Sequence, residues 1–197
     1  MLKKFVLGGM TALVLAACGG EGGSASSSAP AQSANPSGSL IERINNKGTI
    51  TVGTEGTYAP FTYHDKDGKL TGYDVEVTRA VADKLGVKVE FKETQWDSMM
   101  AGLKAGRFDV VANQVGLTSP ERQATFDKSE PYSWSGAVLV ARNDSNIKSI
   151  DDIKGIKTAQ SLTSNYGEKA KAAGADLVPV DGLAQSLTLI EQKRADA

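Results

Sequence analysis

The sequence predicts an α/β fold made of two successive units. Between residues 40 and 141, short runs rich in β-branched side chains alternate with segments whose apolar residues recur at helical spacing. The same alternation begins again within residues 142–197. Strands that alternate with helices form parallel sheets, because each helix carries the chain back to the start of the next strand. We therefore expect one lobe over residues 40–141, followed by part of a second lobe over residues 142–197.

Glycines mark the ends of several elements in the first lobe. Gly48 and Gly86 follow predicted helices, and Gly68 supplies the positive φ that a tight hairpin turn needs. Val77, Val81 and Leu85 recur at helical spacing. The expected elements are a helix at 40–46, a strand at 49–52, a hairpin of 61–63 with 70–73, a helix at 74–85, a strand at 87–91, a helix at 96–104 and a strand at 108–111.

The second unit follows a link between the lobes. We expect a strand at 136–140, a crossover loop at 142–146, a strand at 157–159, a helix at 165–173, a strand at 177–180 and a helix at 183–193. Two α/β units in sequence leave a cleft between them, and ligands bind outside the carboxyl ends of the strands. The loops at those ends are therefore the expected binding site.

The N-terminal 39 residues are expected to lie outside the lobes. Two lysines precede an apolar run at residues 5–17, which is too short for a permanent membrane span and has the layout of a secretory signal. Leu15-Ala16-Ala17-Cys18 resembles the lipobox of bacterial lipoproteins, which implies that Cys18 is lipidated and becomes the mature N-terminus. An ordinary cleaved signal is the alternative. Residues 18–39 are mostly Gly, Ser, Ala and Pro, which predicts a flexible tether.

Composition excludes several classes of protein. Cys18 is the only cysteine, so the lobes can form no disulfide and no thiolate metal site. The net charge is −1 with both signs interspersed, which gives no indication of nucleic-acid binding.

Several motifs together resemble one protein family. Residues 72–77, Gly-Tyr-Asp-Val-Glu-Val, resemble the signature of family 3 solute-binding proteins for polar amino acids. Residues 53–61, Trp96-Asp97, 119–122, 130–132 and 194–197 match further family motifs in order and spacing. The resemblance covers nearly everything after Leu40. It implies a type II periplasmic binding protein-like fold, with two lobes, a hinge and a ligand cleft, and a second lobe that is incomplete at Ala197. A chain of this extent is expected to be a fragment that binds weakly or not at all.

The resemblance implies the substrate-binding component of an ABC amino-acid importer, a monomer without a cofactor that delivers its ligand to a membrane permease. It would be anchored through the lipid on Cys18, in the periplasm or at the cell surface. Gln114, Val115-Gly116 and residues 133–136 are most similar to the cystine or cysteine subgroup. L-Cystine or cysteine is therefore the expected ligand within the polar amino acids.

A free amino acid carries a carboxylate, an ammonium and a side chain, so its site needs a bidentate cation, acceptors and apolar walls. The family's site arginine matches Arg122; from spacing alone, a surface arginine at a helix start is the alternative. Tyr58 and Trp96 match cleft walls or are plain core, and Glu55 matches a side-chain contact or is a solvated loop acid. The remaining matched positions are Gln114, Gly116 and Thr118 after a strand, and Thr163 and Ser164 at a helix N-terminus.

Two other functions are compatible with this fold. Some relatives are cyclohexadienyl or arogenate dehydratases that use cleft carboxylates as proton donors. Others could be receptor sensor modules or adhesive lipoproteins. The lone histidine, His64, is expected in an exposed hairpin turn, and the sequence has no nucleophile elbow and no phosphate-binding loop. We therefore predict a binding protein and no enzyme.

Overall fold

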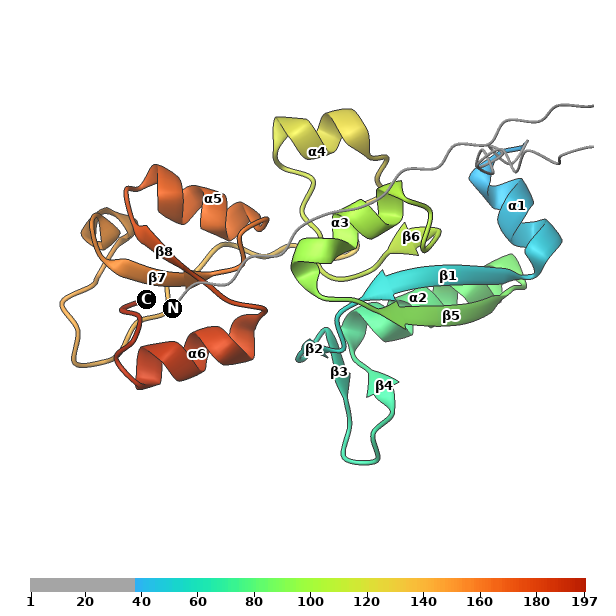
Figure 1. The fold of residues 1–197 in the computed structure, drawn as a ribbon. Coiled ribbons are helices and arrows are strands. Elements are labelled where there is room, and N and C mark those ends of the chain that lie inside the picture. Colours follow the sequence, from blue (N-terminus) through green and yellow to red (C-terminus); the bar gives the residue numbers. More distant parts are fainter. Residues whose placement is uncertain (1–37) are drawn as a thin grey trace, which may run out of the picture. The chain divides into compact units, whose positions relative to one another are not determined.

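Strand β1, Thr49–Thr54, is the central strand of a parallel sheet with the order β5-β1-β6. The computed structural model describes residues 38–197 (Figure 1). The proposed signal, Cys18 and most of the tether lie outside these residues. The sheet is completed by β5, Lys88–Glu93, which pairs along all of β1, and β6, Val110–Val111, which pairs with Val52 and Gly53. The predicted parallel sheet of the first lobe is confirmed.

The core of the first lobe forms between this sheet and its helices. Ile50 and Val52 of β1 pack with Ile44 and Ala82, all less than a tenth exposed. The helices are α1, Leu40–Lys47, α2, Tyr73–Leu85, and α3, Trp96–Lys104. Ser39 caps α1 through a capping box with Glu42, and Gly48 and Gly86 end α1 and α2 in the left-handed conformation.

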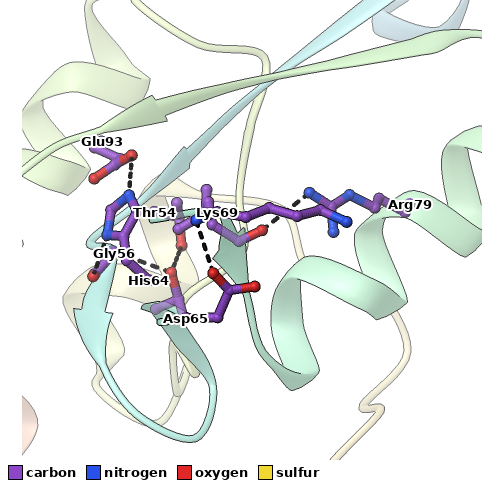
Figure 2. A network of polar contacts seen from close by, with 9 residues as sticks. Thr54, Gly56, His64, Asp65, Lys69, Arg79 and Glu93 are labelled. Atoms are coloured by element: carbon purple, nitrogen blue, oxygen red, sulfur yellow. Dashed lines mark hydrogen bonds and ion pairs between the residues drawn. The ribbon is translucent and has the colours of Figure 1, made fainter. Parts of the chain in front are cut away.

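The predicted hairpin is also confirmed. It is a small antiparallel sheet of β2, Thr57–Tyr58, β3, Thr62–His64, and β4, Leu70–Thr71. In its turn, the Asp65 carboxylate accepts a hydrogen bond from the Lys69 amide at 2.9 Å (Figure 2). It also accepts one from the Asp67 amide at 2.9 Å. These two bonds hold the pKa of Asp65 below its usual value, and the bond from Lys69 has the larger effect.

Helix α2 does not bury the apolar residues whose spacing predicts the helix. Val75 and Ala82 are buried, whereas Val81 and Leu85 are 50% and 40% exposed. The rotation of the helix is fixed at its start, where the amides of its first two residues donate to the carbonyls of Pro60 and Phe61 at 3.0 and 2.9 Å. The apolar periodicity predicts the helix correctly but does not identify its buried face.

The predicted strand at 136–140 is wrong. The structure leaves residues 126–140 without helix or strand, and Val138 is 84% exposed. A strand needs a neighbour to bond its amides and carbonyls, and no described strand pairs with this segment. The strand expected at 108–111 is likewise reduced to β6, with Phe108 buried just before it.

The second lobe contains a two-stranded parallel sheet, as predicted. Its elements are η1, Ile150–Ile153, β7, Lys157–Gln160, α5, Asn165–Ala172, β8, Asp176–Pro179, and α6, Leu183–Glu191. One cluster packs Ala159 and Val180 with Leu189 and Ile190 of α6, and a second contains Ile153 and Ala170. The expected lobe boundary between residues 141 and 142 stays a prediction. No described helix is both long and apolar enough to cross a membrane.

Replacing Gly72 with alanine should lower the free energy of unfolding by about 3 kcal/mol. Gly72 has φ +121°, and an added Cβ would lie 2.4 Å from the carbonyl oxygen of Phe61. Gly68→Ala is the matched control, because Gly68 has φ +75° and open space around it, so its cost should be about 1 kcal/mol. Urea denaturation of both variants measures the difference, and equal losses would contradict the close-contact argument.

Candidate functional site

The site begins where β1 and β6 end, because parallel strands bring their carboxyl ends to one edge of the sheet. Asn113, after β6, is 1% exposed. Its Oδ1 accepts from the Glu55 amide at 2.8 Å and the Thr54 hydroxyl at 3.2 Å, and its Nδ2 donates to Glu55 Oε2 at 2.6 Å. Asn113 therefore fixes both the backbone and the carboxylate of Glu55.

Glu55 is a partly buried acid beside a groove. Burial raises its pKa above the usual value, the Asn113 bond opposes that shift, and the nearby Asp97 charge adds to it. The groove is lined by Glu55, Thr57, Glu93, Thr94 and Gln95 from the first lobe and by Asp181, Gly182, Ala184 and Gln185 from the second. A cationic group in this groove would stabilise the ionised form of Glu55. Glu55 is therefore better suited to an ammonium than an exposed loop acid would be.

Gln114, the next residue after Asn113, is held in a left-handed conformation with φ +51°. Its amide and its Nε2 donate to the two oxygens of the buried Asp74 carboxylate at 2.7 and 2.6 Å. Its Oε1 accepts from the Ser133 hydroxyl at 2.9 Å. Burial raises the pKa of Asp74, although the bonds from Gln114 oppose the shift. The signature residue Asp74 thus orients the loop that leads from β6 to the site.

Arg122 is 7% exposed and lies in α4, Pro120–Thr125, whose first turn is capped by the Ser119 hydroxyl. Its guanidinium donates to the carbonyl oxygens of Gly116 at 3.0 Å and Thr163 at 2.6 Å. It also lies over the Trp96 ring, 5.4 Å from the centroid. Within residues 38–197 it forms no ion pair with a carboxylate. Arg122 is therefore not a surface arginine, so the alternative suggested by spacing alone is wrong.

The remaining predicted residues are placed as follows. Trp96 is partly buried, and its indole Nε1 has no hydrogen-bond partner among the described residues. Tyr58 packs against Phe61 with ring centroids 5.2 Å apart, and burial raises its pKa. Ser164 is buried and caps α5 through a bond from the Gly167 amide at 2.9 Å. Thr118 is exposed.

One contact was not identified from the sequence. Asp97 Oδ1 accepts from the Thr163 amide at 3.1 Å and the Thr163 hydroxyl at 2.7 Å. The Trp96-Asp97 motif was the available signal, but it gave no indication that Asp97 reaches a residue of the second lobe. The structure thus brings together Trp96, Gly116, Arg122 and Thr163, with Asp97 in addition.

His64 lies at the end of β3, and each of its ring nitrogens contacts an oxygen atom. Its Nδ1 contacts the Gly56 carbonyl oxygen at 3.2 Å and its Nε2 contacts Glu93 Oε1 at 3.1 Å (Figure 2). The ring therefore links the hairpin to the end of β5. No group of three or more potential metal-ligating side chains occurs in the described part of the chain.

A second hollow lies on the outer face of α2. Its lining is apolar apart from one lysine, and its members are Val77, Ala80, Val81, Lys84 and Leu85. It has no set of polar groups that could hold both ends of an amino acid. The Arg122 region is the better candidate because it combines a buried cation, backbone carbonyls and an aromatic ring.

Comparisons with known proteins agree on one family. The family described as bacterial extracellular solute-binding proteins, family 3, matches residues 50–194. A probable amino-acid ABC transporter-binding protein of Haemophilus influenzae is 62% identical over 81% of this chain and 62% of its own length. The L-cystine-binding protein TcyA of Bacillus subtilis is 60% identical over 81% of this chain and 59% of its own length. The chain thus spans about three fifths of these curated relatives.

Solved structures of two other proteins are similar to this chain. The L-cystine solute receptor of Neisseria gonorrhoeae, in its unliganded open conformation, is 96% identical over 81% of this chain and 68% of that one, with a TM-score of 0.49. The ancestral amino acid-binding protein AncCDT-1, a precursor of cyclohexadienyl dehydratase, is 35% identical over 81% of this chain and 73% of that one, with a TM-score of 0.73. The second likeness supports the periplasmic binding protein-like fold.

The raised pKa of Glu55 gives a pH-dependent prediction. A buried acid with a raised folded-state pKa costs nothing while protonated, below the unfolded value of about 4.3, and its cost appears as the pH rises through the folded pKa. Wild type should therefore lose stability relative to Glu55→Gln between pH 4 and pH 7. Urea denaturation of both proteins at each pH measures the difference. A constant difference would show that burial of the carboxylate has no net cost.

Proposed function

The chain belongs to the bacterial extracellular solute-binding proteins of family 3, and on that premise we propose that it binds a free amino acid through Arg122 and delivers it to an ABC transporter permease. The buried guanidinium of Arg122 carries this proposal. It is bonded to two carbonyls and lies over an aromatic ring, but no described carboxylate neutralises it. A desolvated cation of this kind is stabilised by a bidentate carboxylate, which every free amino acid supplies.

L-Cystine is the ligand we propose. TcyA, which shares 60% identity with this chain, is named for it. Cystine carries two amino-acid ends whose α-carbons lie about 5.5 Å apart across the disulfide. Its site therefore needs an acceptor for a second ammonium as well as a cation for the first carboxylate. Glu55, held by Asn113 and facing the groove with a raised pKa, is suited to that second ammonium.

The other site residues supply shape and hydrogen bonds in this proposal. Trp96 and Tyr58 form apolar walls. Gly116, Thr118 and Gln114 shape the loop after β6, while Thr163 and Ser164 present the N-terminus of α5. The protein would act as a monomer without a cofactor, anchored through a lipid on Cys18 in the periplasm or at the cell surface.

A dehydratase is the alternative on the same fold. AncCDT-1 is itself an amino acid-binding protein and is described as a precursor of such an enzyme. Glu55 is the acid that could donate a proton to a bound ring, because its pKa is raised. Incubation with arogenate or prephenate, followed by absorbance of the aromatic product, tests this function. We expect no product, and turnover that disappears in Glu55→Gln would establish the enzyme instead.

Removing the guanidinium should abolish most ligand affinity. In a protein extended to the full length of the curated relatives, we expect Arg122→Ala to weaken L-cystine binding about 100-fold or more by calorimetry, because a buried charge pair is lost. Arg122→Lys should lose about tenfold, since lysine keeps the charge but not the planar fork.

The matched control is Arg79→Ala. Arg79 also lies on a helix over an aromatic ring, 5.6 Å from the centroid of Phe91, and it bonds Glu76 and the Leu70 carbonyl. Its loss should leave affinity unchanged. Thermal unfolding without ligand shows whether each variant is folded, and wild-type affinity in a folded Arg122→Ala protein would refute the proposed site.

A further inference from the structure

Thr163 is bonded by first-lobe side chains at each of its polar groups. Its amide and hydroxyl donate to Asp97 Oδ1, at 3.1 and 2.7 Å. Its carbonyl oxygen accepts from Arg122 Nη2 at 2.6 Å. Asp97 is the second residue of α3 and Arg122 lies in α4, so two elements of the first lobe hold one residue of the second.

We propose that Asp97 is a positioning residue that joins the two lobes by holding the Thr163 segment beside Arg122. The inference rests on the proposed function for the identity of the ligand. The joint itself, which consists of the bonds from the Thr163 amide and hydroxyl to Asp97, can be measured without a ligand. Asp97 would contact no ligand. Its effect on binding would arise because it keeps the N-terminal end of α5 within reach of the Arg122 guanidinium.

A carboxylate is suited to this position for two reasons. One of its oxygens can accept both the amide and the hydroxyl of a threonine, and bonds to a charged acceptor are stronger than neutral ones. Asp97 and Thr163 are also exposed, so water competes for both bonds. Competition with water keeps the net contribution small, which allows the joint to break and reform.

The Thr163 segment is stiff enough to transmit this hold to α5. Ser164 caps α5 through the Gly167 amide, and its hydroxyl donates to the Ser161 carbonyl at 3.0 Å. An added Cβ on Gly167 would lie 2.7 Å from that same carbonyl oxygen, so the turn is closely packed. Fixing Thr163 therefore fixes the first turn of α5 as well.

The test compares Asp97→Ala, Thr163→Val and the double variant in the full chain, each with Cys18→Ser. Spin labels are placed at Lys66→Cys in the hairpin turn and Lys171→Cys in α5, both exposed. Without ligand, the label-to-label distance distribution should shift to longer values and broaden in each single variant. Thr163→Val removes only the hydroxyl bond, whereas Asp97→Ala removes the hydroxyl and the amide bonds. The double variant should therefore shift no further than Asp97→Ala. Additive shifts, or no shift in Asp97→Ala, would overturn the proposal.

Conservative variants and a matched acid serve as controls. Thr163→Ser keeps the hydroxyl and should match wild type, while Asp97→Asn keeps a neutral acceptor and should be intermediate. Asp83→Ala removes an exposed acid of α2 and should leave the distances unchanged. If any of these three variants behaves like Asp97→Ala, a general loss of charge or structure explains the effect and the proposal fails.

Ligand kinetics connect the joint to binding. In the same extended protein, L-cystine should dissociate about tenfold faster from Asp97→Ala than from wild type, with association little changed, because two bonds that hold the bound arrangement are lost. Unchanged dissociation despite a shifted distance distribution would refute the effect on binding. If wild type itself binds no cystine while the distances respond as expected, the proposed function fails and the joint stands.

Discussion

The burial of the Arg122 guanidinium without a described carboxylate partner is the constraint on which the rest of the site depends. Taking such a charge out of water costs several kcal/mol unless its donors are satisfied. Here the carbonyls of Gly116 and Thr163 and the face of Trp96 share that task. Guanidinium is weakly hydrated and stacks on aromatic rings, which lysine does not reproduce. The loop after β6, the start of α3 and the segment before α5 must therefore meet at one cation.

Two buried polar networks keep the first-lobe part of this arrangement in place. Asn113 binds the end of β1 to the end of β6 and holds the Glu55 carboxylate. Asp74, at the start of α2, holds Gln114 in its left-handed conformation through both carboxylate oxygens. The two networks have different chemical consequences. Glu55 keeps acceptor capacity toward the groove, whereas the Gln114 side chain is already engaged at both its amide nitrogen and its oxygen.

The sequence identifies most elements because their signals are local. Helical spacing and terminal glycines suffice for α1 and α2, and a β-branched run suffices for β1. The buried face of α2 depends on bonds to Pro60 and Phe61, and a strand at 136–140 would depend on a neighbour, so neither follows from local pattern. The meeting of Arg122 with Trp96 was implied by family resemblance and not by spacing. Asp97 lies 66 residues from Thr163, and nothing in the periodicity of either segment relates them.

The location of each bond also indicates which parts of the site can move. Bonds within the first lobe lie around the buried Asn113 and Asp74, where removing one partner leaves a desolvated polar group and costs about 1–3 kcal/mol. The bonds of Asp97 to Thr163 are exposed, so water can replace either partner when they break. Arg122 shares features of the buried first-lobe bonds and of the bonds between the lobes, because it is buried but donates to the second-lobe carbonyl of Thr163. If a ligand carboxylate binds Arg122 as proposed, it can replace the Thr163 carbonyl there while the first-lobe networks stay intact.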